Sequence, residues 1–199
     1  MRGAFAGAPL CLLAYGLVRL SDPGHGPGVA WTAGHLALAL GVALFGAVFP
    51  GLRRLTGPSA RAGRWGAGVA TGLGLAGAAA VIVQAGIDLA VGFGSADRAG
   101  MDRLFEQIQS RPWVEPVVYS VGPMLFYVGL LWIVGQLAVR RRIAVWRAVA
   151  VLAGTGVMAV SLDLIPLGAL LFSAALSPLG RDLAARECAA RADLAYAGA

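Results

Sequence analysis

Five long runs of apolar residues constrain this chain more than any other feature of its sequence. They cover residues 4–20, 29–49, 66–93, 114–139 and 146–176. A helix needs about 20 apolar residues to cross the roughly 30 Å hydrocarbon core of a bilayer, and a helix satisfies its own backbone hydrogen bonds there. The sequence therefore predicts an all-α, polytopic bundle of five transmembrane helices within residues 1–176.

The low share of charged residues agrees with a surface that faces lipid. Asp, Glu, Lys and Arg make up 13% of the 199 residues, about half of the share in a soluble domain. A net charge of +6 could indicate nucleic-acid binding, but the arginines lie in short loops between the apolar runs. We therefore expect the lipid bilayer as partner and no nucleic acid. A chain rich in Ala, Gly, Arg and Val, without Lys or Asn, is typical of a GC-rich bacterial genome.

The arginines also predict an orientation, because short cytoplasmic loops collect Lys and Arg. Arg2 and the segments 50–65 and 140–147 together hold nine arginines and no carboxylate, whereas the other loops and the tail hold eight of the ten carboxylates. We expect the N-terminus and both basic loops to be cytoplasmic and the C-terminus to lie outside. The predicted location is the inner membrane, as a multi-pass protein.

The first apolar run has two interpretations. Arg2 before an apolar stretch is typical of a secretory signal peptide. Residues 17–28 offer no good small-x-small cleavage site beside the run. We therefore expect the first helix to be retained.

Small residues recur at four-residue spacing in two of the predicted helices. They are Ala33, Ala37 and Gly41 in one helix, and Gly68, Gly72 and Ala76 in the next. Such spacing lets membrane helices approach closely. It supports a compact bundle.

A short amphipathic helix is predicted between the third and fourth spans. One apolar stripe at helical spacing is formed by Met101, Leu104, Phe105 and Ile108. Ser95 or Asp97 can cap the start of this helix, and Pro112 limits its end. We expect it to lie in the outer membrane interface; the alternative is a lid over a bound molecule.

The remaining segments carry little recognisable chemistry. Residues 177–199 form an Ala-rich tail with alternating charges. Cys11 and Cys188 form no C-x-x-C pair and no metal-ligand spacing, which disfavours a disulfide framework or a thiol redox enzyme. The glycines form no phosphate-binding loop motif.

Four polar side chains on four different predicted helices fall at one depth in the outer half of the bundle. They are His35, Asp88, Tyr119 and Asp163, placed by the rise of about 1.5 Å per residue. Ionisable groups are costly in a membrane helix and usually face the bundle interior. The sequence therefore predicts one shared site with these four residues as catalytic candidates.

Three neighbouring residues are candidates for binding a substrate. Trp31, Gln84 and Glu115 each lie one helical turn from His35, Asp88 and Tyr119, respectively. Pro166, three residues past Asp163, predicts a kink beside that carboxylate.

Each candidate also has a purely structural interpretation. Asp88 is close enough to its helix end to reach the interface. His35 can be a hydrogen-bonded packing residue, and Tyr119 fits the aromatic belt at the membrane surface. Asp163 is harder to explain in this way, because apolar residues follow it for about two turns. A shared site and independent structural roles both stay open.

Three chemistries are compatible with a shared site. His35 with two aspartates is a facial ligand set for iron or zinc, and a haem would take His35 with His25 as a second axial ligand. General acid–base chemistry needs only carboxyl groups in an apolar pocket, one of them neutral near pH 7 as a proton donor. Acid–base chemistry requires the fewest specific residues of the three, so we expect no metal and no cofactor.

A small bundle with two intramembrane carboxylates, Asp88 and Asp163, resembles the small integral-membrane terpene cyclases. Those enzymes protonate an isoprenoid alkene or epoxide with an intramembrane acid. The resemblance implies protonation-initiated cyclisation of a lipid-soluble, isoprenoid-like molecule, with one aspartate as proton donor. It covers the architecture of the helical part without a diagnostic motif, and the fungal-type members have more than five helices and acids that are not all aspartates.

Other functions are also compatible with the sequence. The aspartate-rich diphosphate motif of intramembrane prenyltransferases is absent, which disfavours that chemistry. In a proton-coupled transporter the same polar residues would form a relay, although five unequal helices show no convincing inverted repeat. A non-catalytic structural or regulatory subunit would instead satisfy them between helices or against a membrane-protein partner.

Overall fold

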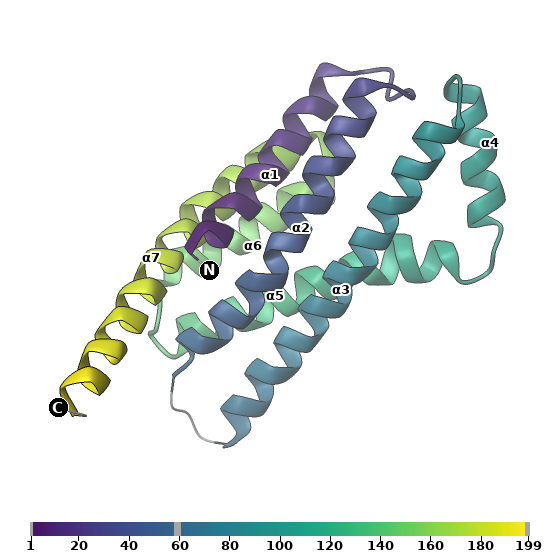
Figure 1. Ribbon diagram of the computed structural model, residues 1–199. Helices are drawn as coiled ribbons and strands as arrows, with labels where there is room; N and C mark the ends of the chain where they lie inside the picture. The colour runs from purple at the N-terminus through teal and green to yellow at the C-terminus, as the bar shows by residue number, and fades with distance from the viewer. Residues whose placement is uncertain (1, 58–60, 198–199) are drawn as a thin grey trace.

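The computed structural model describes residues 2–57 and 61–197, and nearly all of them are helical. The segments in chain order are α1 (Arg2–Ser21), α2 (Val29–Leu55), α3 (Arg61–Gly94), α4 (Arg98–Gln109), the π-helix η1 (Glu115–Val121), α5 (Gly122–Val139), α6 (Val145–Val160), the 3₁₀ turn η2 (Leu162–Leu164) and α7 (Ile165–Ala197). Because η1 leads directly into α5, the two form one continuous rod. Figure 1 shows these helices as a single elongated bundle.

Six of the described helices close into a ring around an aromatic core. Each of α1, α2, α3, α5, α6 and α7 packs on the next in this order, and α7 packs back on α1. The phenylalanines at the centre are Phe5, Phe45, Phe49, Phe126 and Phe172, all with at most 5% of their surface exposed. The rings of Phe45 and Phe126 meet edge to face with centroids 5.0 Å apart, an arrangement that aromatic pairs prefer.

Five helical segments are long and apolar enough to cross a membrane. They are Arg2–Ser21, Val29–Leu55, Arg61–Gly94, Glu115–Val139 and Leu162–Ala185. Leu36, Leu40 and Leu170 on their outer faces are each more than half exposed. Apolar surface on this scale is unusual on a soluble monomer, and the chain is therefore a multi-pass membrane protein.

The prediction of one continuous helix over residues 146–176 is wrong. α6 ends at Val160, Ser161 has an extended backbone, and α7 begins at Ile165. Proline lacks an N–H, and its ring clashes with the carbonyl four residues earlier, but it fits the first turn of a helix. Pro166 therefore marks the start of a new helix and does not kink an existing one. The fifth long span is α7, and α6 is a shorter apolar helix beside it.

α7 runs back along α1, so the C-terminal part of the chain lies toward the same end as the N-terminus. A Cβ atom at Gly16 of α1 would touch Pro166 at the start of α7, and one at Gly180 would touch Phe5 near the start of α1. The expectation that the two termini lie on opposite sides is thus wrong. Residues 146–176 form two antiparallel helices, α6 and the first part of α7, rather than a single span. The predicted tail, 177–199, continues α7 to Ala197 and extends away from the bundle (Figure 1); residues 198–199 lie outside the described part.

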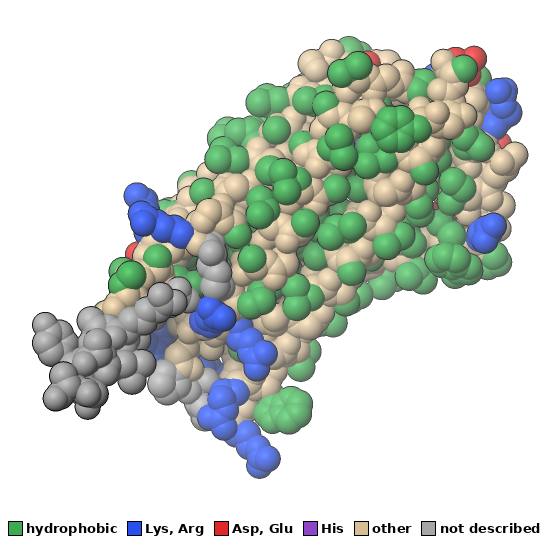
Figure 2. All heavy atoms as spheres, viewed as in Figure 1, with side chains coloured by type: hydrophobic (Ala, Val, Ile, Leu, Met, Phe, Trp, Pro, Cys, Tyr) green, Lys and Arg blue, Asp and Glu red, His purple; other side chains and the backbone are tan. Residues whose placement is uncertain are grey.

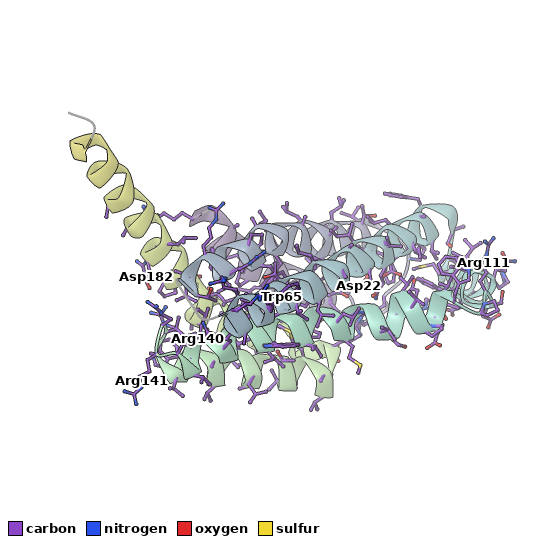
Figure 3. All side chains as sticks on the ribbon, turned by 90° about the horizontal axis from the view of Figure 1, so that it is seen from below. Asp22, Trp65, Arg111, Arg140, Arg141 and Asp182 are labelled. Atoms are coloured by element: carbon purple, nitrogen blue, oxygen red, sulfur yellow. The ribbon has the colours of Figure 1, made fainter. Side chains whose placement is uncertain are left out.

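The two ends of the bundle differ in charge: Figure 2 shows basic side chains gathered at one end and both acidic and basic side chains at the other. We call one the arginine end, because it carries Arg53, Arg54, Arg61, Arg64, Arg140, Arg141 and Arg142. The opposite end carries residues 22–28 and α4, and we call it the α4 end. Figure 3 shows Arg140 and Arg141 at one end and Arg111 at the other.

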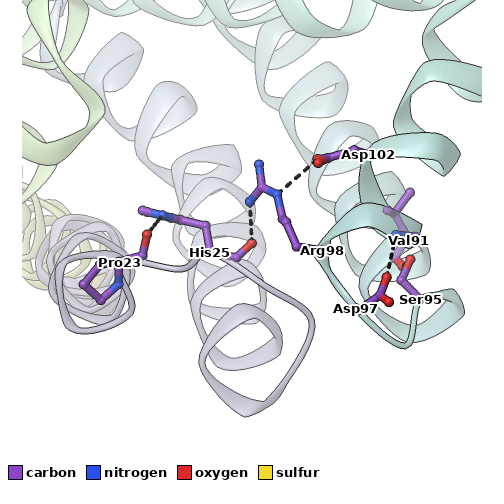
Figure 4. Close-up of polar contacts among 8 residues, drawn as sticks. Pro23, His25, Val91, Ser95, Asp97, Arg98 and Asp102 are labelled. Atoms are coloured by element: carbon purple, nitrogen blue, oxygen red, sulfur yellow. Dashed lines mark hydrogen bonds and ion pairs between the residues drawn. The ribbon is translucent and has the colours of Figure 1, made fainter.

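The structure confirms a helix at the predicted amphipathic segment. Asp97 caps α4 by accepting a hydrogen bond from the backbone nitrogen of Gly100 at 2.7 Å, and Met101 of the apolar stripe is fully buried. Arg98 donates to the carbonyl of His25 at 2.7 Å and pairs with Asp102 at 3.1 Å (Figure 4). α4 is thereby tied across the end of the bundle (Figures 1 and 3); its place in a membrane interface stays a prediction.

Candidate functional site

Asp88 of α3 is buried and is bound by a tyrosine from another helix. Only 6% of its surface is exposed, and the hydroxyl of Tyr119 donates to its Oδ1 at 2.9 Å. Tyr119 lies in the π-helix η1, a form often found at functional sites. Pro123 has no N–H and cannot close the α-helical bond to the carbonyl of Tyr119. Because this α-helical hydrogen bond cannot form, the wider π-helix can occupy the segment that carries Tyr119.

His35 of α2 approaches the other oxygen of the same carboxyl group. Its Nε2 lies 3.5 Å from Oδ2 of Asp88, and both side chains are 8% exposed. Its Nδ1 lies 2.8 Å from the carbonyl oxygen of Trp31, and because a carbonyl only accepts, Nδ1 carries a hydrogen. A neutral ring then has a bare Nε2 that can accept a proton from Asp88, and a charged ring donates to the carboxylate. The pair can thus share one proton.

Trp31 holds α2 and α3 together at this point. Its indole Nε1 donates to the backbone oxygen of Asp88 at 2.7 Å, and its ring lies over that of His35 with centroids 4.1 Å apart. A Cβ atom at Gly92, one turn after Asp88, would lie 2.5 Å from Cδ1 of Trp31. The absence of a side chain at Gly92 therefore permits the indole to reach the carbonyl. Trp31 belongs to the site as a residue that positions Asp88 and His35.

Tyr15 of α1 is a neighbour of the site that the sequence analysis did not identify. Its ring packs edge-on against His35, with centroids 5.7 Å apart. Tyr15 and Arg19 are separated by four residues near the end of α1, so both project from one helical face. That spacing of two polar side chains is the sequence signal that α1 contributes to the site, together with α2, α3 and η1.

A small polar cavity lies between α1 and α2 and reaches His35. Its lining includes Tyr15, Arg19, Asp22, His25, Trp31 and His35, and its volume is about 20 Å³. A cavity needs about 10–15 Å³ to hold a single water. The buried Nε2 of His25 has no hydrogen-bond partner among the described residues, as expected of an atom that binds water. The cavity has room for water beside His35 and none for an isoprenoid.

Asp163 does not join the other three predicted residues. Its side chain is 60% exposed and pairs with Arg19 at 3.2 Å. The helix break at Ser161 is the physical reason, since it places Asp163 in the short turn η2 rather than in the middle of a helix. Because Arg19 also lines the small cavity, that arginine links Asp163 to the site within the described part of the chain.

Within the described part of the chain, the two other predicted substrate-binding residues, Gln84 and Glu115, make no hydrogen bond with Asp88 or His35, unlike Trp31. Gln84 is one turn from Asp88, and its buried Oε1 has no hydrogen-bond partner among the described residues. Glu115 is exposed at the start of η1 and accepts a hydrogen bond from Ser120 at 3.4 Å. Glu115 therefore belongs to the helix end, whereas Gln84 lies beside the site with an unused acceptor.

The Asp163→Asn variant is expected to lower the free energy of unfolding by at most about 1 kcal/mol. The ion pair with Arg19 is largely exposed on the Asp163 side, and exposed pairs are screened and contribute about 0–1 kcal/mol. Thermal unfolding in detergent measures this, with Asp102→Asn, which breaks the exposed pair with Arg98, as the matched control. A several-fold larger loss for Asp163→Asn than for the control would contradict the peripheral role of Asp163.

Comparison of the chain with protein-family models, with curated proteins and with solved structures finds no match. Within the described residues, no group of three or more His, Cys, Asp or Glu is placed to hold a metal ion. The facial set of His35 with two aspartates does not assemble, since Asp163 pairs with Arg19. What the site can do therefore follows from a buried carboxyl group, an imidazole that can share its proton, and nearby space for water.

Proposed function

We propose that the protein is a proton-exchanging membrane protein in which Asp88, His35 and Tyr119 form an acid–base centre. The observation that carries the proposal is the contact of His35 Nε2 with Asp88 Oδ2 at 3.5 Å, inside the bundle. A histidine beside a carboxyl group is suited to taking up and releasing a proton near neutral pH. Buried ionisable groups in membrane helices commonly form proton relays.

Each residue has a distinct part in the proposed exchange. A proton that arrives through water in the small cavity is held between Nε2 of His35 and Oδ2 of Asp88. The Tyr119 hydroxyl stabilises the ionised carboxylate by donating to Oδ1. The bond from Nδ1 of His35 to the carbonyl of Trp31 keeps the bare nitrogen directed at Asp88. Release of the proton reverses these steps.

The exchange is proposed to face the outer side of the membrane. If the arginine end is cytoplasmic, as the positive-inside rule predicts, then the α4 end and the small cavity face outward. Phe45, Phe49 and Phe126 pack tightly in the core toward the arginine end. Such packing excludes water, which supports exchange with one side and disfavours an open channel. We propose the inner membrane of a bacterium as the cellular location, on the basis of the composition and the arginine-rich loops.

Acid–base catalysis on a lipid-soluble molecule is the second candidate, and one observation favours it. An open groove of about 610 Å³ runs along α2 and α3 and is lined in part by Thr32, Leu36, Gly92 and Phe93. Neither Trp31 nor Asp88 lines this groove. Trp31 lies against Gly92 of the lining and donates to the backbone oxygen of Asp88, so we infer that a molecule in the groove reaches Asp88 only after the indole moves. Cyclisation of the terpene cyclase type needs that movement, whereas proton exchange with water does not.

Infrared spectroscopy of the purified protein in proteoliposomes tests the proposal. We expect a reversible change in the carbonyl band of a protonated carboxylic acid when the pH of the outer solution is stepped through the neutral range. Ionophore-free vesicles with a trapped pH indicator then establish whether the proton also crosses. The absence of any buried carboxyl band that responds to pH would contradict proton exchange at Asp88.

A further inference from the structure

A hollow at the arginine end has the character of an anion-binding site. It is lined by Arg53 of α2 and by Arg61, Arg64, Trp65, Gly68 and Val69 of α3, and it has an open volume of about 480 Å³. We call it the arginine groove. It lies at the opposite end of the bundle from the Asp88 site, and Figure 2 shows the gathering of basic side chains at this end.

The sequence places these side chains together by helical spacing. Arg61, Arg64 and Gly68 lie at i, i+3 and i+7 of α3, which is one face of a helix. The guanidinium of Arg53 reaches across from α2, because its Nη2 lies 4.0 Å from where a Cβ atom of Gly68 would be. Because Gly68 has no side chain, the surface of α3 beside the Arg53 guanidinium is left free of side-chain atoms at this position.

The groove combines positive charge with a residue typical of the headgroup region. Its lining contains three arginines and no carboxylate. Asp182 lies at the same end but pairs with Arg147 at 3.8 Å and lines no part of the groove. Trp65 is 69% exposed, and tryptophan at the end of a spanning helix sits at the level of lipid headgroups.

An apolar track continues from the groove along the same face of α3. Gly68, Gly72 and Ala76 follow at four-residue spacing, and a Cβ atom at Gly72 would meet nothing within 4 Å. Gly72 and Ala76 are exposed, and Val69 and Leu75 flank them with 45% and 37% of their surfaces exposed. A shallow strip between larger apolar side chains suits an extended acyl chain, which gains dispersion contacts along its length.

We propose that the arginine groove binds one anionic phospholipid. The phosphate lies between Arg53 and the arginines of α3, and one acyl chain follows the track from Gly68 to Ala76. Arginine forms paired, charge-assisted hydrogen bonds to phosphate, and basic pockets between membrane helices bind anionic headgroups. Free inorganic phosphate shares the headgroup chemistry but gains nothing from the track. This inference does not depend on proton exchange at Asp88.

Quenching of Trp65 fluorescence by phospholipids with brominated acyl chains tests the site in the purified, delipidated full chain. The probes are brominated phosphatidylglycerol and phosphatidylcholine, and subtraction of the Trp65→Phe signal isolates this tryptophan. We expect phosphatidylglycerol to quench at about tenfold lower concentration. Arg53→Gln combined with Arg61→Gln should weaken its binding at least tenfold, because each arginine near an anionic surface contributes roughly fivefold.

Arg141→Gln is the matched control, since Arg141 is an exposed arginine at the same end that does not line the groove. It should leave the quenching unchanged. If the double glutamine variant does not fold, Arg53→Lys with Arg61→Lys keeps the charge and removes the paired hydrogen bonds, and binding should still weaken. Equal quenching by phosphatidylcholine, equal loss with Arg141→Gln, or complete displacement by inorganic phosphate would each overturn the proposal.

Discussion

The Asp88→Asn variant is expected to lose completely the pH-dependent carboxylic acid band of the reconstituted protein. Asparagine keeps the volume of aspartate and can still accept a hydrogen bond from Tyr119, but it cannot bind or release a proton. His35 then has no carboxyl group beside it with which it could share a proton. Infrared spectroscopy during pH steps in proteoliposomes measures the band directly, without knowledge of any transported or converted molecule.

Two exposed carboxylates make this test specific. Asp163 and Glu115 were both candidates from the sequence, but Asp163 pairs with Arg19 and Glu115 lies at an exposed helix end. Asp163→Asn and Glu115→Gln should therefore leave the buried-acid band as it is in the native chain. Persistence of the band in Asp88→Asn would assign it to another residue and remove the proposed function. Its loss in all three variants would indicate a general change of structure.

The depth of the polar residues could be predicted from the sequence, because the rise per residue of a helix is constant. His35, Asp88 and Tyr119 were placed at one level, and the structure brings these three together. Asp163 had the same predicted depth, but counting residues along one helix assumed that the helix continues. The extended backbone at Ser161 ends that count. In the sequence, Pro166 is the signal for the break, but a proline fits both a kink within a helix and the first turn of a new one.

Helix rotation could not be predicted, because nearly every face of these helices is apolar. The glycine and alanine spacing at Gly68, Gly72 and Ala76 is real, yet Gly72 and Ala76 are exposed. The close contact of α3 with α5 is made on another face, at Gly74 and Gly77. A soluble helix would reveal its buried face through its polar residues, whereas a membrane helix exposes apolar residues to lipid as well.

The contact between α3 and α5 leads to the largest expected effect on stability. A Cβ atom at Gly77 would lie 2.6 Å from Cα of Phe126 and 2.8 Å from the carbonyl oxygen of Gly122. Both are backbone atoms, so no side-chain rotation can relieve the clash, and α3 and α5 must move apart. Gly77→Ala is therefore expected to lower the free energy of unfolding by about 2–3 kcal/mol, near the upper range for overpacked sites.

Gly86→Ala provides the control on the same helix, because a Cβ atom there would meet nothing within 4 Å. Gly86→Ala changes the backbone entropy in the same way as Gly77→Ala and adds the same methyl group. We therefore expect it to raise the free energy of unfolding by up to about 1 kcal/mol through helix propensity alone. Unfolding of both variants in mixed micelles separates packing from propensity. Equal stability of the two variants would show that α3 and α5 are not in backbone contact at Gly77. Because η1, which carries Tyr119, is continuous with α5, separation of α3 from α5 should also weaken the hydrogen bond of Tyr119 to Asp88.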